Sequence, residues 1–298
     1  MPYRPQDAEQ KEPLKKEEKE GNASSAGKEI QEGAQEVVQE ARQEVAAARR
    51  PWYQTVRWGR ILLAAYAIQL SLFALLAFWV STHPVLGIDV TITREFQENN
   101  SPWLEFLMVA VSYIGNVFAL SLGLIVLAFV VFWALDLRLE AITIVVLSVV
   151  SSLLNGLIKT IVGRPRPNAS LVEILQVAGG KSFPSGHVMS YVAFWGLLFS
   201  FSVILFQGRR WWRIALMIIS ALFVVLVGPS RIYLGDHWAS DVLGAYLIGG
   251  VLLGITLWIY LKLKERDVLA PRKQRGWYHQ SSRSKQRNKS APIERPSQ

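Results

Sequence analysis

The stretch VLGAYLIGGVLLGITLWIYL, residues 242–261, is uncharged and long enough to cross a bilayer as one helix. A hydrocarbon core needs roughly 17–25 apolar residues in helical form. Five similar runs precede it, so the sequence predicts an all-α fold of six transmembrane helices. The six predicted spans are 61–80, 106–135, 141–158, 188–206, 211–229 and 242–261. The second span is over-long for a hydrocarbon core of about 30 Å, so we expect its start to lie in the interface or the helix to tilt.

Charged segments flank the spans. Of the 298 residues, 51% are hydrophobic and none is cysteine, which excludes disulfide and thiolate chemistry. We expect three parts: a charged tail over 1–54 with a polar helix near 28–50, a membrane domain over 55–262 and a basic tail over 263–298. The last part is expected to anchor topology or to contact anionic headgroups. No motif indicates nucleic-acid binding.

The distribution of arginines predicts the orientation. With six spans, three basic stretches fall on one side: the region before the first span, the loop near 207–213 and the basic tail. The arginines before the first span and in that loop are Arg49, Arg50, Arg57, Arg60, Arg209, Arg210 and Arg213. The positive-inside rule makes this side, and both termini, cytoplasmic. Loops 81–105, 159–187 and 229–241 then face outward.

Two of the outward loops carry basic residues that oppose this bias. These residues are Lys159, Arg164, Arg166, Lys181 and Arg231. An anionic ligand is the simplest explanation. Phosphoryl transfer requires fixed positive donors around the anionic oxygens. Lys159, Arg166 and Arg231 supply a point charge and planar forks suited to that purpose.

A predicted helix start at Ser185 adds to the anion site. Backbone N–H groups at a helix N-terminus favour anions, and Gly186 permits close approach. The Ser185 hydroxyl either caps the helix or donates to the phosphate. For Lys159 alone, snorkelling towards water is an equally simple explanation, and the RPRP segment could be a loop breaker with incidental charge.

Two of the four histidines lie near this basic cluster. His237 and Asp241 are four residues apart, which predicts one helix face, and a carboxylate on one ring nitrogen leaves the other free to attack. His187 is then the candidate acid for the leaving group. A structural His237–Asp241 pair remains the alternative, and Asp236 could compete for His237. The basic residues neutralise the charge, so the scheme needs no metal and no cofactor.

The remaining histidines, His83 and His279, lack such surroundings. We interpret them as an interfacial residue and a tail residue. The coincidence of two histidines with basic residues at one predicted membrane face is what favours catalysis.

Three motifs resemble the signature of the type-2 phosphatidic acid phosphatase superfamily. They are K-x6-R-P from Lys159 to Arg166, P-S-G-H ending at His187, and S-R-x5-H-x3-D from Ser230 to Asp241. The resemblance covers about residues 55–262 and implies a helical bundle of the acid phosphatase/vanadium haloperoxidase type. Members act without a metal ion.

The resemblance also implies a role for each motif residue. His237 would form a phosphohistidine, oriented by Asp241, and His187 would protonate the leaving group. The implied phosphate-binding residues are Lys159, Arg166, Ser185, Gly186 and Arg231.

The expected function is a plasma-membrane phosphatase with its site on the non-cytoplasmic face. The substrate is a lipid phosphate or diphosphate, either phosphatidate-type or undecaprenyl-diphosphate-type. Phosphatidylglycerophosphate and a small sugar phosphate are alternatives within the enzyme class. A non-catalytic lipid-binding or transport protein is the competing class. A transporter typically carries ionisable residues near the middle of its spans, and the six predicted spans have few. The oligomeric state stays open.

Overall fold

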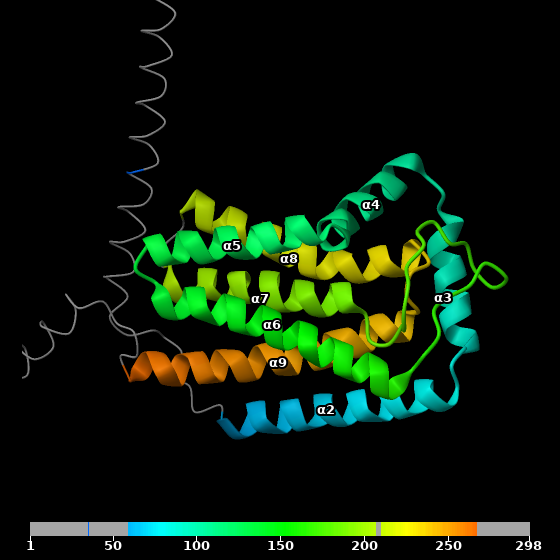
Figure 1. Cartoon of the computed structure of the whole chain (residues 1–298), viewed down its shortest axis with the longest axis horizontal. Helices are drawn as coiled ribbons and strands as arrows, with labels where there is room; N and C mark the ends of the chain where they lie inside the picture. The colour runs from blue at the N-terminus through cyan, green and yellow to red at the C-terminus, as the bar shows by residue number, and fades with distance from the viewer. Residues whose placement is uncertain (1–34, 36–58, 207–209, 267–298) are drawn as a thin grey trace, which may run out of the picture.

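Helices build all of the regular structure in the part of the chain that the computed structural model describes: residue 35, residues 59–206 and residues 210–266. Figure 1 shows them running side by side between two ends of a bundle, with one short helix across one end. The helices are α2 (Gly59–Thr82), α3 (Gly87–Glu98), α4 (Pro102–Asn116), α5 (Phe118–Ala134), α6 (Arg138–Val162), α7 (Gly186–Leu205), α8 (Trp211–Tyr233) and α9 (Ala239–Glu265). The predicted all-α class is confirmed for these residues.

Five of the six predicted spans are single helices long and apolar enough to cross a membrane. They are α2, α6, α7, α8 and α9. The span predicted over 106–135 is instead two helices, α4 and α5, bent by 71° at Val117. The break is locally satisfied, because the Val117 amide donates to the Tyr113 carbonyl at 3.1 Å and Ser121 Oγ donates to the Ile114 carbonyl at 2.6 Å. A break thus divides the over-long segment, in place of the single tilted helix that is one of the two expectations; the other, a start in the interface, stays a prediction.

The centre of the bundle is α7. It packs against α4, α6, α8 and α9, and its apolar residues point in all directions, as expected for a helix enclosed by others. Leu197 and Phe201 on this helix have no exposed surface. By contrast, α2 and α5 leave many large apolar side chains exposed, among them Leu75, Phe78 and Phe118, and these are the faces that lipid would cover.

The short helix α3 lies across one end of the bundle (Figure 1). The sequence predicts 81–105 as an outward connection between spans, and within this connection Gly87–Glu98 form a helix that the sequence did not predict. Side chains of α3 fix it to neighbouring backbone. Arg94 Nε donates to the Leu171 carbonyl at 2.9 Å, and Gln97 Nε2 donates to the carbonyls of Glu173 at 2.8 Å and Tyr233 at 3.0 Å.

The α3 end of the bundle also gathers the last turns of α6 and α8, the first turns of α7 and α9, and the segment 163–185 (Figure 1). All three sequence motifs therefore meet there.

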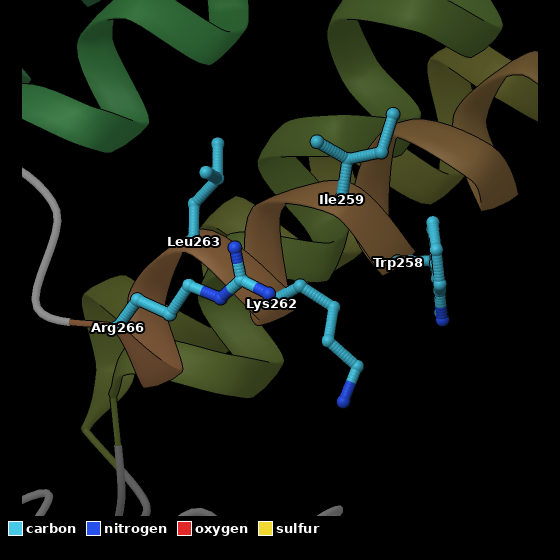
Figure 2. A pocket seen from close by; sticks show the side chains of 5 residues that line it. All are labelled: Trp258, Ile259, Lys262, Leu263 and Arg266. Atoms are coloured by element: carbon cyan, nitrogen blue, oxygen red, sulfur yellow. The ribbon is translucent and has the colours of Figure 1, made fainter.

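The opposite end of the bundle is held by Glu140, the buried carboxylate of α6. It accepts hydrogen bonds of 2.7 Å each from Lys264 Nζ and Tyr260 Oη of α9. A surface pocket lies on the last turns of α9 (Figure 2). Its lining residues are Trp258, Ile259, Lys262, Leu263 and Arg266.

Several predictions concern residues outside the described ranges. Of the predicted tail over 1–54, with its polar helix, only residue 35 is described. Of the basic tail, the part beyond residue 266 falls outside, as does His279. Arg49, Arg50, Arg57 and Arg209 also fall outside.

Candidate active site

Three helix ends and two connecting segments bring these predicted site residues together. Lys159 lies in the last turn of α6, and Arg231 in the last turn of α8. Ser185 is the N-cap residue of α7, so Gly186 and His187 open that helix. Arg166 lies on the segment 163–185, and His237 lies between α8 and α9. The charged members are close enough to interact electrostatically with one another.

His237 is buried, with 1% of its surface exposed, and its two ring nitrogens face different partners. Nδ1 lies 3.5 Å from Asp241 Oδ2, while Nε2 lies 3.3 Å from Arg166 Nη1. Burial lowers the pKa of His237 from 6.5 to about 3, although the Asp241 carboxylate opposes that shift. The imidazole is therefore neutral at physiological pH, with Nε2 directed to the basic cluster.

The His237–Asp241 contact does not arise from helical spacing. The prediction that both residues share one helix face is wrong, because α9 begins at Ala239 and His237 precedes its N-cap residue, Trp238. Asp241 instead reaches back: its Oδ2 accepts the Trp238 amide at 2.9 Å and lies 3.5 Å from His237 Nδ1. A carboxylate in the first turn is also favoured by the helix dipole.

Asp241 is saturated with further donors. It has no exposed surface. Its Oδ2 also accepts the Ser182 hydroxyl, and its Oδ1 accepts Arg164 Nη1 at 2.7 Å. A carboxylate held by this many donors keeps a single orientation.

Arg166 is fixed by backbone carbonyls. Its Nε donates to the Gly179 carbonyl at 2.9 Å and its Nη1 to the Asp236 carbonyl at 2.8 Å. Burial lowers the pKa of the Arg166 guanidinium, but an arginine retains its proton at physiological pH. Lys159 Nζ donates to the Lys181 carbonyl at 2.5 Å, so the snorkelling alternative for Lys159 does not hold.

Arg231 is buried, and its guanidinium pairs with Asp236 Oδ2 at 2.5 Å. The same group donates from Nη1 to the Ser112 hydroxyl and to Asn116 Oδ1 of α4. Asp236 therefore partners Arg231 and does not compete for His237. Burial raises the pKa of Asp236, an effect that the Arg231 charge opposes.

Several buried polar atoms around this cluster have no hydrogen-bond partner among the described residues. Three of them, Ser185 Oγ, His187 Nε2 and Arg231 Nε, can donate to a ligand; the others are Trp238 Nε1 and the two carboxylate oxygens of Asp236, whose Oδ2 forms the ion pair with Arg231. The alternative in which Ser185 caps α7 is not observed, since its side chain makes no cap hydrogen bond. Buried polar groups are nearly always bonded. The three donor-capable atoms are therefore candidates to bind the oxygens of an anionic ligand.

Arg164 corrects one prediction. The sequence groups it with the basic residues that await an anionic ligand, but its guanidinium is buried between two carboxylates. Nη2 lies 2.7 Å from Asp89 Oδ2, and Nη1 lies 2.7 Å from Asp241 Oδ1. Arg164 is therefore occupied within the protein. Lys181, the other extra cation, is exposed.

Sequence reasoning missed several polar residues that complete the cluster. They are Asp89, Ser112, Asn116, Ser182 and Ser240. Ser112 and Asn116 are four residues apart in an otherwise apolar stretch, which is a usable signal for one polar helix face. Asp89 and Ser182 offer no such signal, because their partners lie far away in the sequence.

No group of three or more histidine, aspartate or glutamate side chains in the described ranges is arranged to hold a metal ion. The expectation of metal-independent chemistry stays a prediction.

Comparisons with known proteins agree on one family. The sequence profile of the PAP2 superfamily matches residues 140–265. Phosphatidylglycerophosphatase B of Bacillus subtilis is 30% identical over 182 residues, covering 60% of this chain and 87% of the relative. An undecaprenyl-diphosphatase of Sulfolobus acidocaldarius is 28% identical, covering 62% of this chain and 85% of the relative.

One solved structure is also similar. The crystal structure of a transmembrane PAP2-type phosphatidylglycerolphosphate phosphatase from Bacillus subtilis aligns with a TM-score of 0.58 and 26% identity. The alignment covers 66% of this chain and 96% of that one.

Proposed function

The chain belongs to the PAP2 superfamily and is a membrane-spanning lipid phosphatase, and we propose that His237 is the nucleophile with which it attacks the phosphate ester. In this proposal Lys159, Arg166 and Arg231 bind the phosphoryl oxygens. The observation that carries it is the set of unpartnered buried atoms beside the neutral imidazole of His237. In this proposal the phosphoryl and leaving oxygens accept from the donor-capable atoms among them, Ser185 Oγ, His187 Nε2 and Arg231 Nε.

The proposed reaction has two steps. In the first, His237 Nε2 attacks phosphorus, the bond between phosphorus and the leaving oxygen breaks, and protonated His187 gives its proton to that oxygen. In the second, neutral His187 takes a proton from water, and the resulting hydroxide displaces His237 to release phosphate. The His237 Nδ1 proton points to Asp241 throughout, which stabilises the cationic phosphoimidazole.

The binding residues have separate parts in this scheme. Ser185 Oγ and the amides of the first turn of α7 donate to the phosphoryl oxygens, and Gly186 keeps that turn accessible. A methyl group at Gly186 would lie 3.2 Å from Asn155 Oδ1, so space at this turn is limited.

We place the site on the non-cytoplasmic face of the plasma membrane, with both termini cytoplasmic. Support comes from the positive-inside rule, since Arg138, Arg213, Lys264 and Arg266 lie at the bundle end opposite His237. The basic tail over 263–298 would then contact anionic headgroups of the inner leaflet.

Phosphatidylglycerophosphate is the proposed main substrate, because the Bacillus subtilis relative that this chain spans over 87% of its length carries that activity in its name. Undecaprenyl diphosphate is the second candidate, on the strength of the Sulfolobus relative. Both present a phosphate at the membrane boundary while their chains remain in the bilayer.

Phosphate release by the purified protein in EDTA tests this function. Phosphatidylglycerophosphate, phosphatidate, undecaprenyl diphosphate and a soluble sugar phosphate are compared at equal detergent. We expect turnover of the lipid substrates, fastest with phosphatidylglycerophosphate, and an acid-labile phosphoenzyme after quenching. Turnover of the sugar phosphate alone would overturn the lipid proposal, and an absence of phosphoenzyme in wild type under single-turnover conditions would overturn the role of His237.

A further inference from the structure

A buried network joins α3 to the first turn of α9. Asp89 of α3 has 1% of its surface exposed, and both of its carboxylate oxygens are used. Oδ1 accepts the Ser240 amide at 2.9 Å. Oδ2 accepts the Ser240 hydroxyl at 2.6 Å and Arg164 Nη2 at 2.7 Å. Asp89 thereby adds a second capping acceptor to the N-terminus of α9, beside Asp241, which accepts the Trp238 amide.

Arg164 connects this carboxylate to the site. Its Nη1 donates to Asp241 Oδ1 and to the Ser240 hydroxyl, both at 2.7 Å. Its Nε donates to the Pro84 carbonyl at 2.8 Å, and its guanidinium lies 5.9 Å from the centre of the Trp238 ring. The fork of Arg164 is therefore fixed from several directions and aimed at one oxygen of Asp241.

The charge balance of the network bears on catalysis. If Asp241 were the only partner of Arg164, the guanidinium would neutralise its carboxylate. Asp89 binds the same guanidinium, so the positive charge of Arg164 is shared between two carboxylates. Two carboxylates against one arginine leave one net negative charge, and His237 is the group beside it that becomes cationic during the proposed reaction. Asp89 thus reduces the share of the Arg164 charge that Asp241 receives, which leaves more of the Asp241 charge to stabilise the cationic imidazole in the transition state.

We propose that Asp89 is a positioning residue, which acts through Arg164 and Ser240 to orient Asp241 and to keep its negative charge available to His237. The inference deepens the proposed function and rests on it, since it concerns the same reaction. Asp89 touches neither His237 nor any other proposed substrate-binding residue.

The competing explanation is that Asp89 has a purely structural role and only holds α3 against α9. A double-mutant cycle separates the two, because residues that act through one another show non-additive effects. The variants are Asp89→Asn, Asp241→Asn and the double variant, measured by phosphate release and by melting temperature. Glu140→Gln is the matched control: it makes the same carboxylate-to-amide change in a buried ion pair at the far end of the bundle.

We expect Asp89→Asn to lower kcat about 10- to 100-fold with KM changed less than about twofold, as for supporting residues of other catalytic centres. In the Asp241→Asn background the same change should lower kcat less than about twofold. Asp89→Glu should retain more activity than Asp89→Asn, because it keeps the charge. Glu140→Gln should leave kcat unchanged.

Three results would overturn the inference. They are a wild-type kcat in Asp89→Asn, an equal fold-loss of kcat in both backgrounds, or a fall in kcat that Glu140→Gln reproduces at an equal fall in melting temperature. If Asp89→Asn does not accumulate in the membrane, Ser240→Ala replaces it in the same cycle, with the same expectation of non-additivity. A wild-type protein inactive on every lipid phosphate would instead refute the proposed function.

Discussion

Gly115 faces the imidazole of His187 so closely that a methyl group in its place would overlap the ring. The last turn of α4 thus forms one wall of the proposed acid's position. The same turn supplies Ser112 and Asn116 to Arg231. The second span therefore contributes to the site although it carries none of the three sequence motifs.

Gly115→Ala should reduce activity by displacing His187. We expect kcat to fall at least about tenfold, since a positioned general acid contributes roughly 10²–10⁴ in rate. Gly123→Ala in α5 is the control, because its methyl group would meet nothing within 4 Å. The comparison is made by phosphate release at equal membrane abundance. Equal activity of the two variants would show that His187 tolerates displacement or is not the acid.

His187→Ala should affect substrates according to their leaving group. With a lipid phosphate, whose alkoxide needs a proton, kcat should fall roughly 10²–10⁴-fold. With an aryl phosphate of low leaving-group pKa, the loss should be much smaller, because departure then needs no proton. The measurement is kcat on both substrate types, and an equal loss on both would contradict the role of His187 as acid.

His237→Ala should remove turnover by about 10³-fold or more, the scale seen when a nucleophile is deleted. It should also abolish the acid-labile phosphoenzyme. His83→Ala is the control, since His83 is exposed just after α2 and its ring contacts only Thr82 and Trp79 among the described residues. Phosphoenzyme formation in His237→Ala at wild-type level would place the nucleophile elsewhere.

The protonation of His237 offers a test by NMR with ¹³C-labelled histidine, assigned through His237→Ala. Burial lowers the pKa of His237 to about 3, so its resonance should stay at the neutral position from pH 8 down to pH 5. The titratable and charged groups that interact with it are Arg166, His187, Arg231 and Asp241. A titration midpoint above pH 5 would contradict the expectation.

The same shift has a consequence for stability, with a definite sign. Below pH 6.5 the unfolded chain takes up a proton at His237 that the folded chain refuses until about pH 3. This group therefore stabilises the fold above pH 6.5, and that contribution declines as pH falls from 6.5 towards 3. Melting temperature against pH should show this decline, and His237→Ala should show a shallower one.

Lys264→Ala should destabilise the far end of the bundle without affecting turnover. It removes one of the donors to the buried Glu140 carboxylate, at a cost of about 1–3 kcal/mol in unfolding free energy. Lys262→Ala removes only an exposed pair with Glu265 and should change stability by less than about 1 kcal/mol. Thermal unfolding in one detergent compares them, and equal melting temperatures would contradict the assigned role of Glu140.

Length and polarity of the apolar runs were sufficient to predict five spans, because each run fits the bilayer on its own. The gathering of Lys159, His187 and His237 at one end followed from the same topology. The break at Val117 could not be predicted, since both flanking segments are strongly apolar and the bend is decided by packing against α8 and α7. The short helix α3 escaped prediction because its twelve residues carry little hydrophobicity.

The roles of individual charges were harder to predict than their location. Arg164 and Arg166 are two residues apart and chemically identical, yet one is enclosed by Asp89 and Asp241 and the other borders His237. The difference is set by carboxylates that lie about 75 residues away in either direction. Sequence spacing within a loop carries no information about such partners.

The break at Val117 separates two requirements that one straight helix could not meet. The seventeen residues of α5 suit a hydrocarbon core of about 30 Å at about 1.5 Å per residue. The fifteen residues of α4 turn aside by 71° and expose Trp103, Phe106 and Tyr113. Such side chains prefer the headgroup boundary. The length of α5 alone is thus sufficient to match the hydrocarbon core, while α4 packs against α7 and α8 and keeps Gly115 beside His187. Bilayers of different thickness should leave the catalytic distances unchanged.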